Sequence, residues 1–272
     1  MPYSLRELNV VIERLWPSEH AASWDRPGIT IGALDDSVSS VHLAVDAVEA
    51  SVDEALSLGA DALLVHHPLL LRGVTSVAQD SYKGAMITRL IRGGCALIAA
   101  HTNADIVADG VSDVFAQRLG LTGTAPIVAS AMPGTGTGRV GDLPEPLTLG
   151  RLALKLAEIL PATATGIRVA GHYDTAISRV ALCGGAGDSL LFEPGVEGAD
   201  VFITADLRHH PASEARERAL LGLGPALIDV SHWASEWLWL EVAAEKLRAA
   251  LPHLTVTVSE LRTDPWDFVV TQ

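Results

Sequence analysis

Two hydrophobic periodicities alternate along the chain and predict an α/β protein. Ser4 and Glu7 have the spacing of a helix-capping box, and apolar residues follow on one helical face until Pro17. Short, continuous apolar runs between helical stretches indicate buried, largely parallel strands. The strands are expected at 28–32, 41–45, 62–65, 96–100, 167–170, 179–182, 201–204, 226–230 and 254–258. The longer helices are expected at 5–15, 47–58, 83–93, 147–160, 212–221 and 233–250.

The two halves of the chain repeat this order of elements, which predicts an internal duplication. Residues 61–68 end in His66-His67-Pro68, and we align them with residues 200–211, which end in His209-His210-Pro211. Residues 131–146 between the halves are rich in Gly and Pro, which is typical of a loop. The predicted domains are therefore a first α/β repeat at 1–130, a connecting loop at 131–146 and a second repeat at 147–272. Each repeat is expected to contain a largely parallel sheet.

Composition narrows the classes of protein to consider. The chain has 272 residues, 49% of them apolar and 19% charged, which is ample for a packed core. The formal net charge of −14 argues against binding to nucleic acid or to an anionic membrane surface. Its two cysteines lie far apart in the sequence, and neither a secretory signal nor an apolar run of membrane-spanning length is present. A cytoplasmic protein is expected.

Polar residues follow three of the predicted buried strands. The clusters are His66-His67, His101 to Asp105, and His232 to Glu236. Ligands of open α/β sheets bind beyond the carboxyl ends of strands. His232 and Glu236 stand four residues apart at the start of a predicted helix, so both project from one face. Imidazole and carboxylate ligands suit Zn, Mn, Fe or Ni, and the sequence does not select among them.

Each cluster taken alone has a simpler explanation. A histidine pair is often a polar turn, His-x-x-x-Glu is often a solvated pair, and Asp105 could cap a helix. Three clusters at equivalent strand ends favour a shared metal site. Two divalent ions bring about +4 charges and the carboxylates of Asp105 and Glu236 bring −2, which leaves positive charge for an anionic substrate. Such a site activates water, and the chain has no G-x-S-x-G nucleophile motif.

These residues also resemble a known family, the NIF-three-like (NGG-interacting factor three) proteins, which are also called GTP cyclohydrolase type 2 homologues. The resemblance runs nearly end to end and is carried by a series of short motifs in order. They are Trp24-Asp-Arg-Pro-Gly28, Val65-His-His-Pro-Leu69, His101-Thr-Asn-Ala-Asp105, Gly138-Arg-Val-Gly141, Gly184-Gly-Ala-Gly-Asp188, Thr204-Ala-Asp-Leu-Arg-His-His210 and Asp229-Val-Ser-His-Trp-Ala-Ser-Glu236.

The resemblance implies a dinuclear metal centre, a fold and an assembly. By resemblance, the five ligands of two divalent ions are His66, His67, Asp105, His232 and Glu236. The implied fold consists of two intertwined α/β domains with mixed sheets, assembled as a homohexamer. Arg26, Ala104 and Trp233 depart from the residues usual in the family, and these departures bear on substrate contacts. His101 lies at the same sheet edge outside the ligand set, either as a proton-transferring residue or as a cap of the strand end.

Two hypotheses from different classes follow. The first is a metal-dependent hydrolase of cyclohydrolase or phosphoesterase type, acting on a small anionic, nucleotide-like substrate. The second is a non-catalytic scaffold that stores, delivers or senses metal ions. A nucleic-acid interaction module is the third possibility, and the charge of −14 argues against it.

Overall fold

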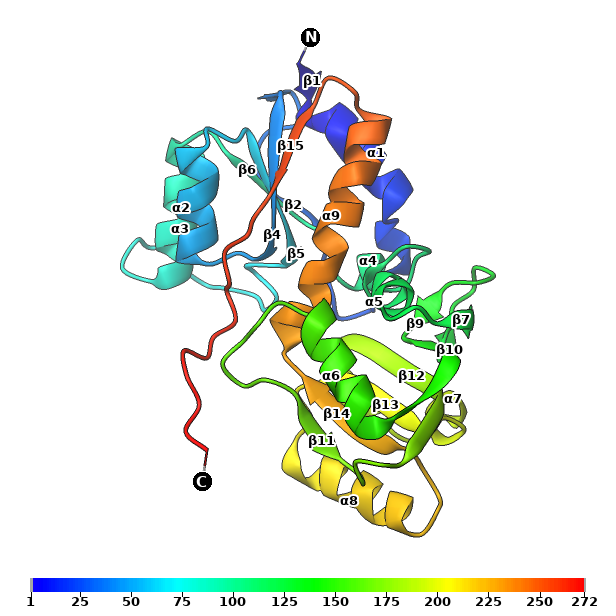
Figure 1. Cartoon of the computed structure of the whole chain (residues 1–272). Helices are drawn as coiled ribbons and strands as arrows, with labels where there is room; N and C mark the ends of the chain where they lie inside the picture. The colour runs from blue at the N-terminus through cyan, green and yellow to red at the C-terminus, as the bar shows by residue number, and fades with distance from the viewer. Residues whose placement is uncertain (1, 272) are drawn as a thin grey trace. The chain divides into compact units, whose positions relative to one another are not determined.

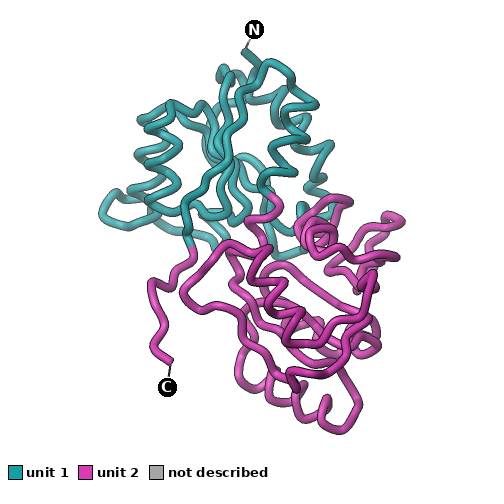
Figure 2. The backbone as a smooth tube through the Cα atoms, viewed as in Figure 1, with its two compact units in different colours: residues 1–104, 240–263 teal, residues 105–239, 264–272 magenta. Residues whose placement is uncertain are grey.

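The computed structural model describes residues 2–271, which form two compact units (Figure 2). Unit 1 comprises residues 1–104 and 240–263, and unit 2 comprises residues 105–239 and 264–272. The chain thus enters unit 2 at Asp105, returns to unit 1 at Leu240 and leaves it again after Thr263. Each unit has its own sheet and its own apolar core.

Unit 1 is built on a five-stranded sheet with the order β15-β4-β5-β6-β2. Three neighbouring pairs in this sheet are parallel, and β2 runs antiparallel to β6. Helices α2 and α3 cover one face, and α1 with the second half of α9 lies on the other (Figure 1). The bounds are β2 (Gly28–Ile31), β4 (Ser40–Asp46), β5 (Ala62–His67), β6 (Ala96–Ala99), β15 (Thr255–Val258), α1 (Leu5–Leu15), α2 (Glu49–Ser57), α3 (Tyr82–Arg92) and α9 (His232–Ala250). Two short strands, β1 (Tyr3–Ser4) and β3 (Ser37–Val38), pair beside the start of α1.

Unit 2 is built on a six-stranded sheet with the order β11-β14-β13-β12-β10-β7. Its three central strands are parallel, and the outer pairings are antiparallel. Buried residues of β12, β13, η2, α7 and α8 share one apolar cluster. The bounds are β7 (Thr122–Ala125), β10 (Arg139–Thr148), β11 (Arg168–Ala170), β12 (Ala176–Ala186), β13 (Val201–Ala205), β14 (Ala226–Val230), α5 (Val111–Leu119), α6 (Leu149–Ile159), η2 (Asp188–Leu190), α7 (Pro194–Glu197) and α8 (His209–Leu220). The mixed α/β class expected from the sequence is confirmed.

The two sheets share one four-strand motif, as an internal duplication predicts. Strands β4-β5-β6-β2 of unit 1 and β12-β13-β14-β11 of unit 2 have the same order, with two parallel pairs followed by an antiparallel edge. A glycine allows the same close approach in both units. A Cβ on Gly32 would lie 2.7 Å from Leu5 and 2.9 Å from Ala96. The equivalent Gly171 is similarly crowded by Leu149 and Ala226.

Hydrogen bonds at the start of each sheet repeat as well. The Asp61 Oδ2 accepts from the backbone N–H groups of Ser39 and Ser40, at 2.8 and 3.0 Å. The Asp200 Oδ2 accepts from the N–H groups of Ser178 and Arg179, at 2.7 and 2.8 Å. Asp61 therefore holds the start of β4, and Asp200 holds β12 near its third and fourth residues, by accepting N–H groups that need acceptors.

This correspondence changes the alignment made from the sequence. Since Asp61 matches Asp200, His66 and His67 match Ala205 and Asp206 at the end of β13. The pair His209-His210 lies beyond this point, exposed at the start of α8. The domain bounds 1–130 and 147–272 stay a prediction about the repeats, whereas the compact units follow different bounds.

The segment 131–146 is more regular than its composition suggests. It contains β9 (Gly136–Thr137), which pairs with β8 (Val128–Ala129), and most of β10. The two prolines Pro144 and Pro146 fall where the pairing of β10 is irregular, between Asp142 and Leu147, so they remove no regular ladder bond. The buried Arg139 orders the segment: its guanidinium donates to the carbonyls of Gly136 and Gly138, each at 2.7 Å, and pairs with Asp113. The expectation of a loop here was wrong.

Replacing Asp61 with Ala should lower the free energy of unfolding by about 1–3 kcal/mol, because strand β4 loses its acceptor. Burial alone would raise the pKa of Asp61, but the hydrogen bonds from Ser39 and Ser40 hold that pKa below its ordinary value of 3.8. The contribution of the charged carboxylate is therefore complete at neutral pH and is lost as the pH falls through the lowered pKa. Urea unfolding measures this loss of stability in D61A, with D80A as a control at an exposed site. Equal stabilities of the two variants at pH 7 would contradict the role.

Candidate metal centre

Three histidines of unit 1 meet where β5 and β6 end. His66 and His67 are the last residues of β5, and His101 follows β6. The ring centroid of His66 lies 5.0 Å from that of His67 and 5.3 Å from that of His101. One ring nitrogen from each of the three lies within 4.8 Å of the others, a spacing that could hold a metal ion. The sequence prediction that these strand ends converge is confirmed within unit 1.

The Nδ1 atom of each of these histidines faces an oxygen acceptor. The partner of His66 is the carbonyl oxygen of Ala100, at 2.9 Å, and that of His67 is the Asp46 Oδ1, at 2.7 Å. The Nδ1 of His101 lies 3.0 Å from the Asp25 Oδ2. Carbonyl and carboxylate oxygens only accept, so the Nδ1 atoms of His66 and His67 carry the proton and donate. In the neutral ring the lone pair is then on Nε2, the arrangement typical of metal-binding histidines.

Asp25 is the buried partner that orients His101. Its Oδ2 also accepts from the hydroxyl of Thr102, at 2.6 Å, and from the backbone N–H of Thr102, at 3.1 Å. Burial would raise the pKa of Asp25, but the hydrogen bonds from Thr102 and His101 outweigh it and lower that pKa. Burial and the neighbouring His66 lower the pKa of His101, against the opposing effect of Asp25. The pair is thus an ionised carboxylate beside a neutral imidazole.

Unit 2 carries the second group, His232 and Glu236, on the first turns of α9. The His232 Nδ1 lies 2.8 Å from the Asp206 Oδ2, so a carboxylate contacts this ring as one contacts the ring of His67. Its Nε2 lies 2.9 Å from the Glu236 Oε1. Glu236 is buried, and the i, i+4 spacing brings the two side chains together, as the sequence predicts.

The start of α9 is held by hydroxyl groups. The Ser231 Oγ accepts from the backbone N–H of Ala234 at 3.2 Å, as a helix cap does. The Ser235 Oγ accepts from the backbone N–H of Gly185 at 2.9 Å. Gly185 has a φ of +70°, and a Cβ there would overlap the Glu236 carboxylate and lie 3.2 Å from the His232 Nε2. The glycine therefore leaves the space that these two side chains occupy.

Asp105 also lies in unit 2, within electrostatic reach of Cys183, as Glu236 does. Burial, together with the negative charges of Asp105 and Glu236, raises the pKa of the Cys183 thiol to about 12. Both carboxylates are therefore close enough to Cys183 to act on its thiol electrostatically. The five predicted ligands are thus divided between the units, with His66 and His67 in unit 1 and Asp105, His232 and Glu236 in unit 2.

Sequence reasoning missed the carboxylates that orient the histidines, namely Asp25, Asp46 and Asp206. Asp46 could have been found, because it ends β4 and is the register partner of His67 on β5. Asp206 is harder to find, since it adopts a left-handed φ of +56° just after β13. Asp25 stands in the Trp24–Gly28 motif, but only the fold brings it to His101.

The donor set fits a divalent metal ion. It combines the Nε2 atoms of His66 and His67, whose Nδ1 atoms face oxygen acceptors, with the imidazole of His232 and the carboxylate of Glu236. Zn–N and Zn–O bonds are about 2.0–2.2 Å long, so two ligand atoms 2.9 Å apart, like those of His232 and Glu236, can bind one ion. The second contacts of the histidines match those known to raise metal affinity.

No helix among residues 2–271 combines the length and apolar character that a bilayer crossing needs.

Fold and site together define a mixed α/β protein with a candidate metal centre at its strand ends. The sequence profile of the Duf34/NIF3 (NGG1p interacting factor 3) family matches residues 3–265. The chain therefore belongs to the Duf34/NIF3 family, as its motifs indicate.

Related proteins and solved structures agree. A Streptomyces coelicolor protein named GTP cyclohydrolase 1 type 2 homolog is 47% identical, with 96% of this chain and 93% of the relative covered. A Mycobacterium bovis protein of the same name is 35% identical, with 98% and 97% covered. The crystal structure of a Bacillus cereus protein related to NIF3 has a TM-score of 0.90 at 24% identity, covering 98% of this chain and 99% of that one. A Staphylococcus aureus protein has a TM-score of 0.87 at 26% identity, covering 99% and 100%.

Replacing Gly185 with Ala should displace the Glu236 carboxylate and reduce the metal content of the purified protein. The substitution combines left-handed strain with the overlap. Gly222→Ala is the matched control, because Gly222 has a φ of +73° and a Cβ added there would meet no atom within 4 Å. Elemental analysis of both variants after identical metal loading separates overlap from strain. The same metal content in G185A and G222A would show that Gly185 does not shape the site.

Proposed function

We propose that this protein binds two divalent metal ions through His66, His67, Asp105, His232 and Glu236, and hydrolyses a small anionic, nucleotide-like substrate. The proposed reaction class is that of a cyclohydrolase or phosphoesterase. The observation that carries the proposal is the shared orientation of the histidines, each with Nδ1 bonded to a carbonyl or carboxylate oxygen. Metal-binding histidines almost always have such a partner on their other ring nitrogen, which supports the proposal.

The charge of the group supports two ions in place of one. Asp105 and Glu236 bring two negative charges near Cys183, and Glu236 is buried, where a negative charge is costly without a cation. The first ion would be held by His232 and Glu236, and the histidines that end β5 would supply ligands for the second. Bound divalent ions supply Lewis acidity and a water molecule of lowered pKa.

His101 is proposed to move the proton in this reaction. Asp25 holds its Nδ1, so the lone pair on Nε2 is available to accept a proton from an attacking water and to return it to a leaving group. Thr102 fixes Asp25 in turn through two hydrogen bonds, which keeps the imidazole in one orientation. This is the arrangement of an oriented general base.

An exposed aromatic side chain beside His101 supports a substrate with a flat ring. Trp24 is 61% exposed, and its ring centroid lies 5.8 Å from that of His101 at an interplanar angle of 73°. An indole left in solvent next to a reactive imidazole can stack on a nucleobase. The relatives named GTP cyclohydrolase 1 type 2 homolog agree with a purine nucleotide as the class of substrate.

Elemental analysis of the purified protein should find two metal equivalents per chain. The double variant H67A/E236A should lose both, because it removes one ligand from each unit. Asp46→Ala should weaken metal binding about 10–100-fold by releasing the His67 ring, and the exposed Asp80→Ala should leave it unchanged. Mass measurement in solution tests the accompanying proposal of a homohexamer. Full metal content in H67A/E236A would overturn the ligand assignment.

His101→Ala should leave the metal content intact and abolish turnover of nucleotides, cyclic nucleotides or phosphodiesters assayed with Zn, Mn or Fe. Asp25→Asn should lower the rate less, because the amide oxygen can still accept from Nδ1. Loss of metal in H101A would make His101 a ligand and not a proton-transferring residue. If the wild-type protein turns over none of these substrates, the metal-handling scaffold replaces the enzyme as the better explanation.

A further inference from the structure

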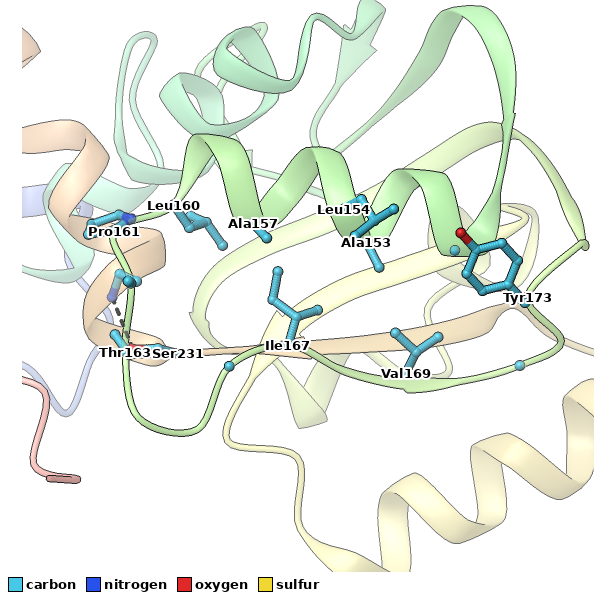
Figure 3. A pocket seen from close by; sticks show the side chains of 15 residues that line it. Ala153, Leu154, Ala157, Leu160, Pro161, Thr163, Ile167, Val169, Tyr173 and Ser231 are labelled. Carbon is cyan, nitrogen blue, oxygen red and sulfur yellow. Dashed lines mark hydrogen bonds between the residues drawn. The ribbon is translucent and has the colours of Figure 1, made fainter. Parts of the chain in front are cut away.

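Unit 2 contains an apolar pocket that lies between α6 and β11 (Figure 3). Its volume of about 530 Å³ is within the range of roughly 300–1,000 Å³ found for ligand sites. Ala153, Leu154 and Ala157 of α6 line one side, and Ile167 and Val169 line the other. Strand β11 is an edge of the sheet and is paired only with β14 in the described chain. A backbone edge and an apolar pocket therefore lie side by side.

The duplication shows that this apolar lining is particular to unit 2. Leu5 at the start of α1 corresponds to Leu149 at the start of α6, and the first N–H of each helix bonds in the same way to the loop that follows its edge strand. Counting on, Arg6, Asn9 and Glu13 of α1 correspond to Gly150, Ala153 and Ala157 of α6. This helix face thus carries polar side chains in α1, whereas in α6 it carries small or apolar residues and borders the pocket.

The C-terminal segment of the chain has the complementary character. Trp266, Phe268 and Val270 are 61%, 79% and 73% exposed. They alternate along the chain, so an extended segment presents all three on one side. Large apolar side chains exposed together are typical of an interaction surface.

The segment starts at the rim of the pocket. Ser231, which lines the pocket, donates its hydroxyl proton to the Asp264 Oδ2 at 2.5 Å. The following six residues, 265–270, can span about 20 Å when extended. Two copies that bring these rims together around a two-fold axis could therefore exchange their segments, and the contact would be the same in both directions.

We propose that residues 266–270 of one copy dock in extended form along β11 of a second copy, with Trp266 and Phe268 in the pocket between α6 and β11. Strand addition pairs the free edge of β11, while alternate side chains fill the pocket. In the single chain, the pocket and the large side chains of the C-terminal segment are both exposed. The exchange covers both of these apolar surfaces. Because this contact involves none of the proposed metal ligands, it is independent of the proposed function.

Disulfide trapping between two single-cysteine variants tests this proposal. Chains carrying Ala153→Cys are mixed with chains carrying Phe268→Cys, and the mixture is oxidised with diamide. The expected product is a disulfide-linked pair with one chain of each kind, identified by mass spectrometry of the linked peptides. The native cysteines do not interfere, since burial raises the pKa of Cys95 to about 11 and that of Cys183 to about 12.

Matched variants make the result decisive. Glu158→Cys replaces Ala153→Cys as a control, because Glu158 is an exposed residue of α6 that does not line the pocket. Adding Trp266→Ala to the Phe268→Cys chain should abolish the crosslink, and adding Asp267→Ala, on the other side of the extended segment, should preserve it. Equal crosslinking at positions 153 and 158, or no crosslink at either, overturns the proposal. So does a disulfide that forms only within one chain carrying both cysteines, since the segment would then cover its own pocket.

Discussion

The hydrogen bond from each histidine Nδ1 to an oxygen is the interaction on which the candidate centre depends. It fixes the tautomer, and through the tautomer it decides which nitrogen can bind a cation. His66 relies on a backbone carbonyl, whereas His67 and His232 rely on carboxylates. A carboxylate partner also raises the basicity of the ring, so the three ligands need not be equivalent in strength. The contacts that orient these histidines therefore lie within the unit that carries each histidine.

The shared strand order of the two units shows where their functional candidates differ. His67 ends β5, and the matching residue at the end of β13 is Asp206. In unit 1 this position supplies a candidate ligand that Asp46 orients, and in unit 2 it supplies the carboxylate that orients His232. The shared fold thus keeps a functional position at the strand end while the residue there changes its role. The apolar face of α6 is a second such divergence, at a helix whose counterpart α1 is polar on that side.

Strand and helix periodicity predicted most of the fold because the central strands are buried and apolar throughout. Sequence patterns predict the structure least well where one side chain orders a segment whose composition is typical of a loop. Arg139 does this for the segment rich in Gly and Pro before α6. The candidate ligands were found because they follow buried strands, a local feature of the sequence. Asp25 and Asp206 were not found, since their role depends on contacts across 76 and 26 positions and on a left-handed turn at Asp206. No periodicity records such contacts.

The division of the candidate ligands between the units has a thermodynamic consequence for the proposed centre. Asp105 is the first residue of unit 2, and α9 begins with His232 in unit 2 and continues into unit 1 at Leu240. A metal ion that binds only folded ligand groups would add its binding free energy to the stability of the unit that supplies them. Local stability and metal affinity would then be linked, because the Nδ1 bonds that orient the ligands exist only in the folded units. Selection for the metal would thereby also preserve Asp46 and Asp206, which by this account never touch it.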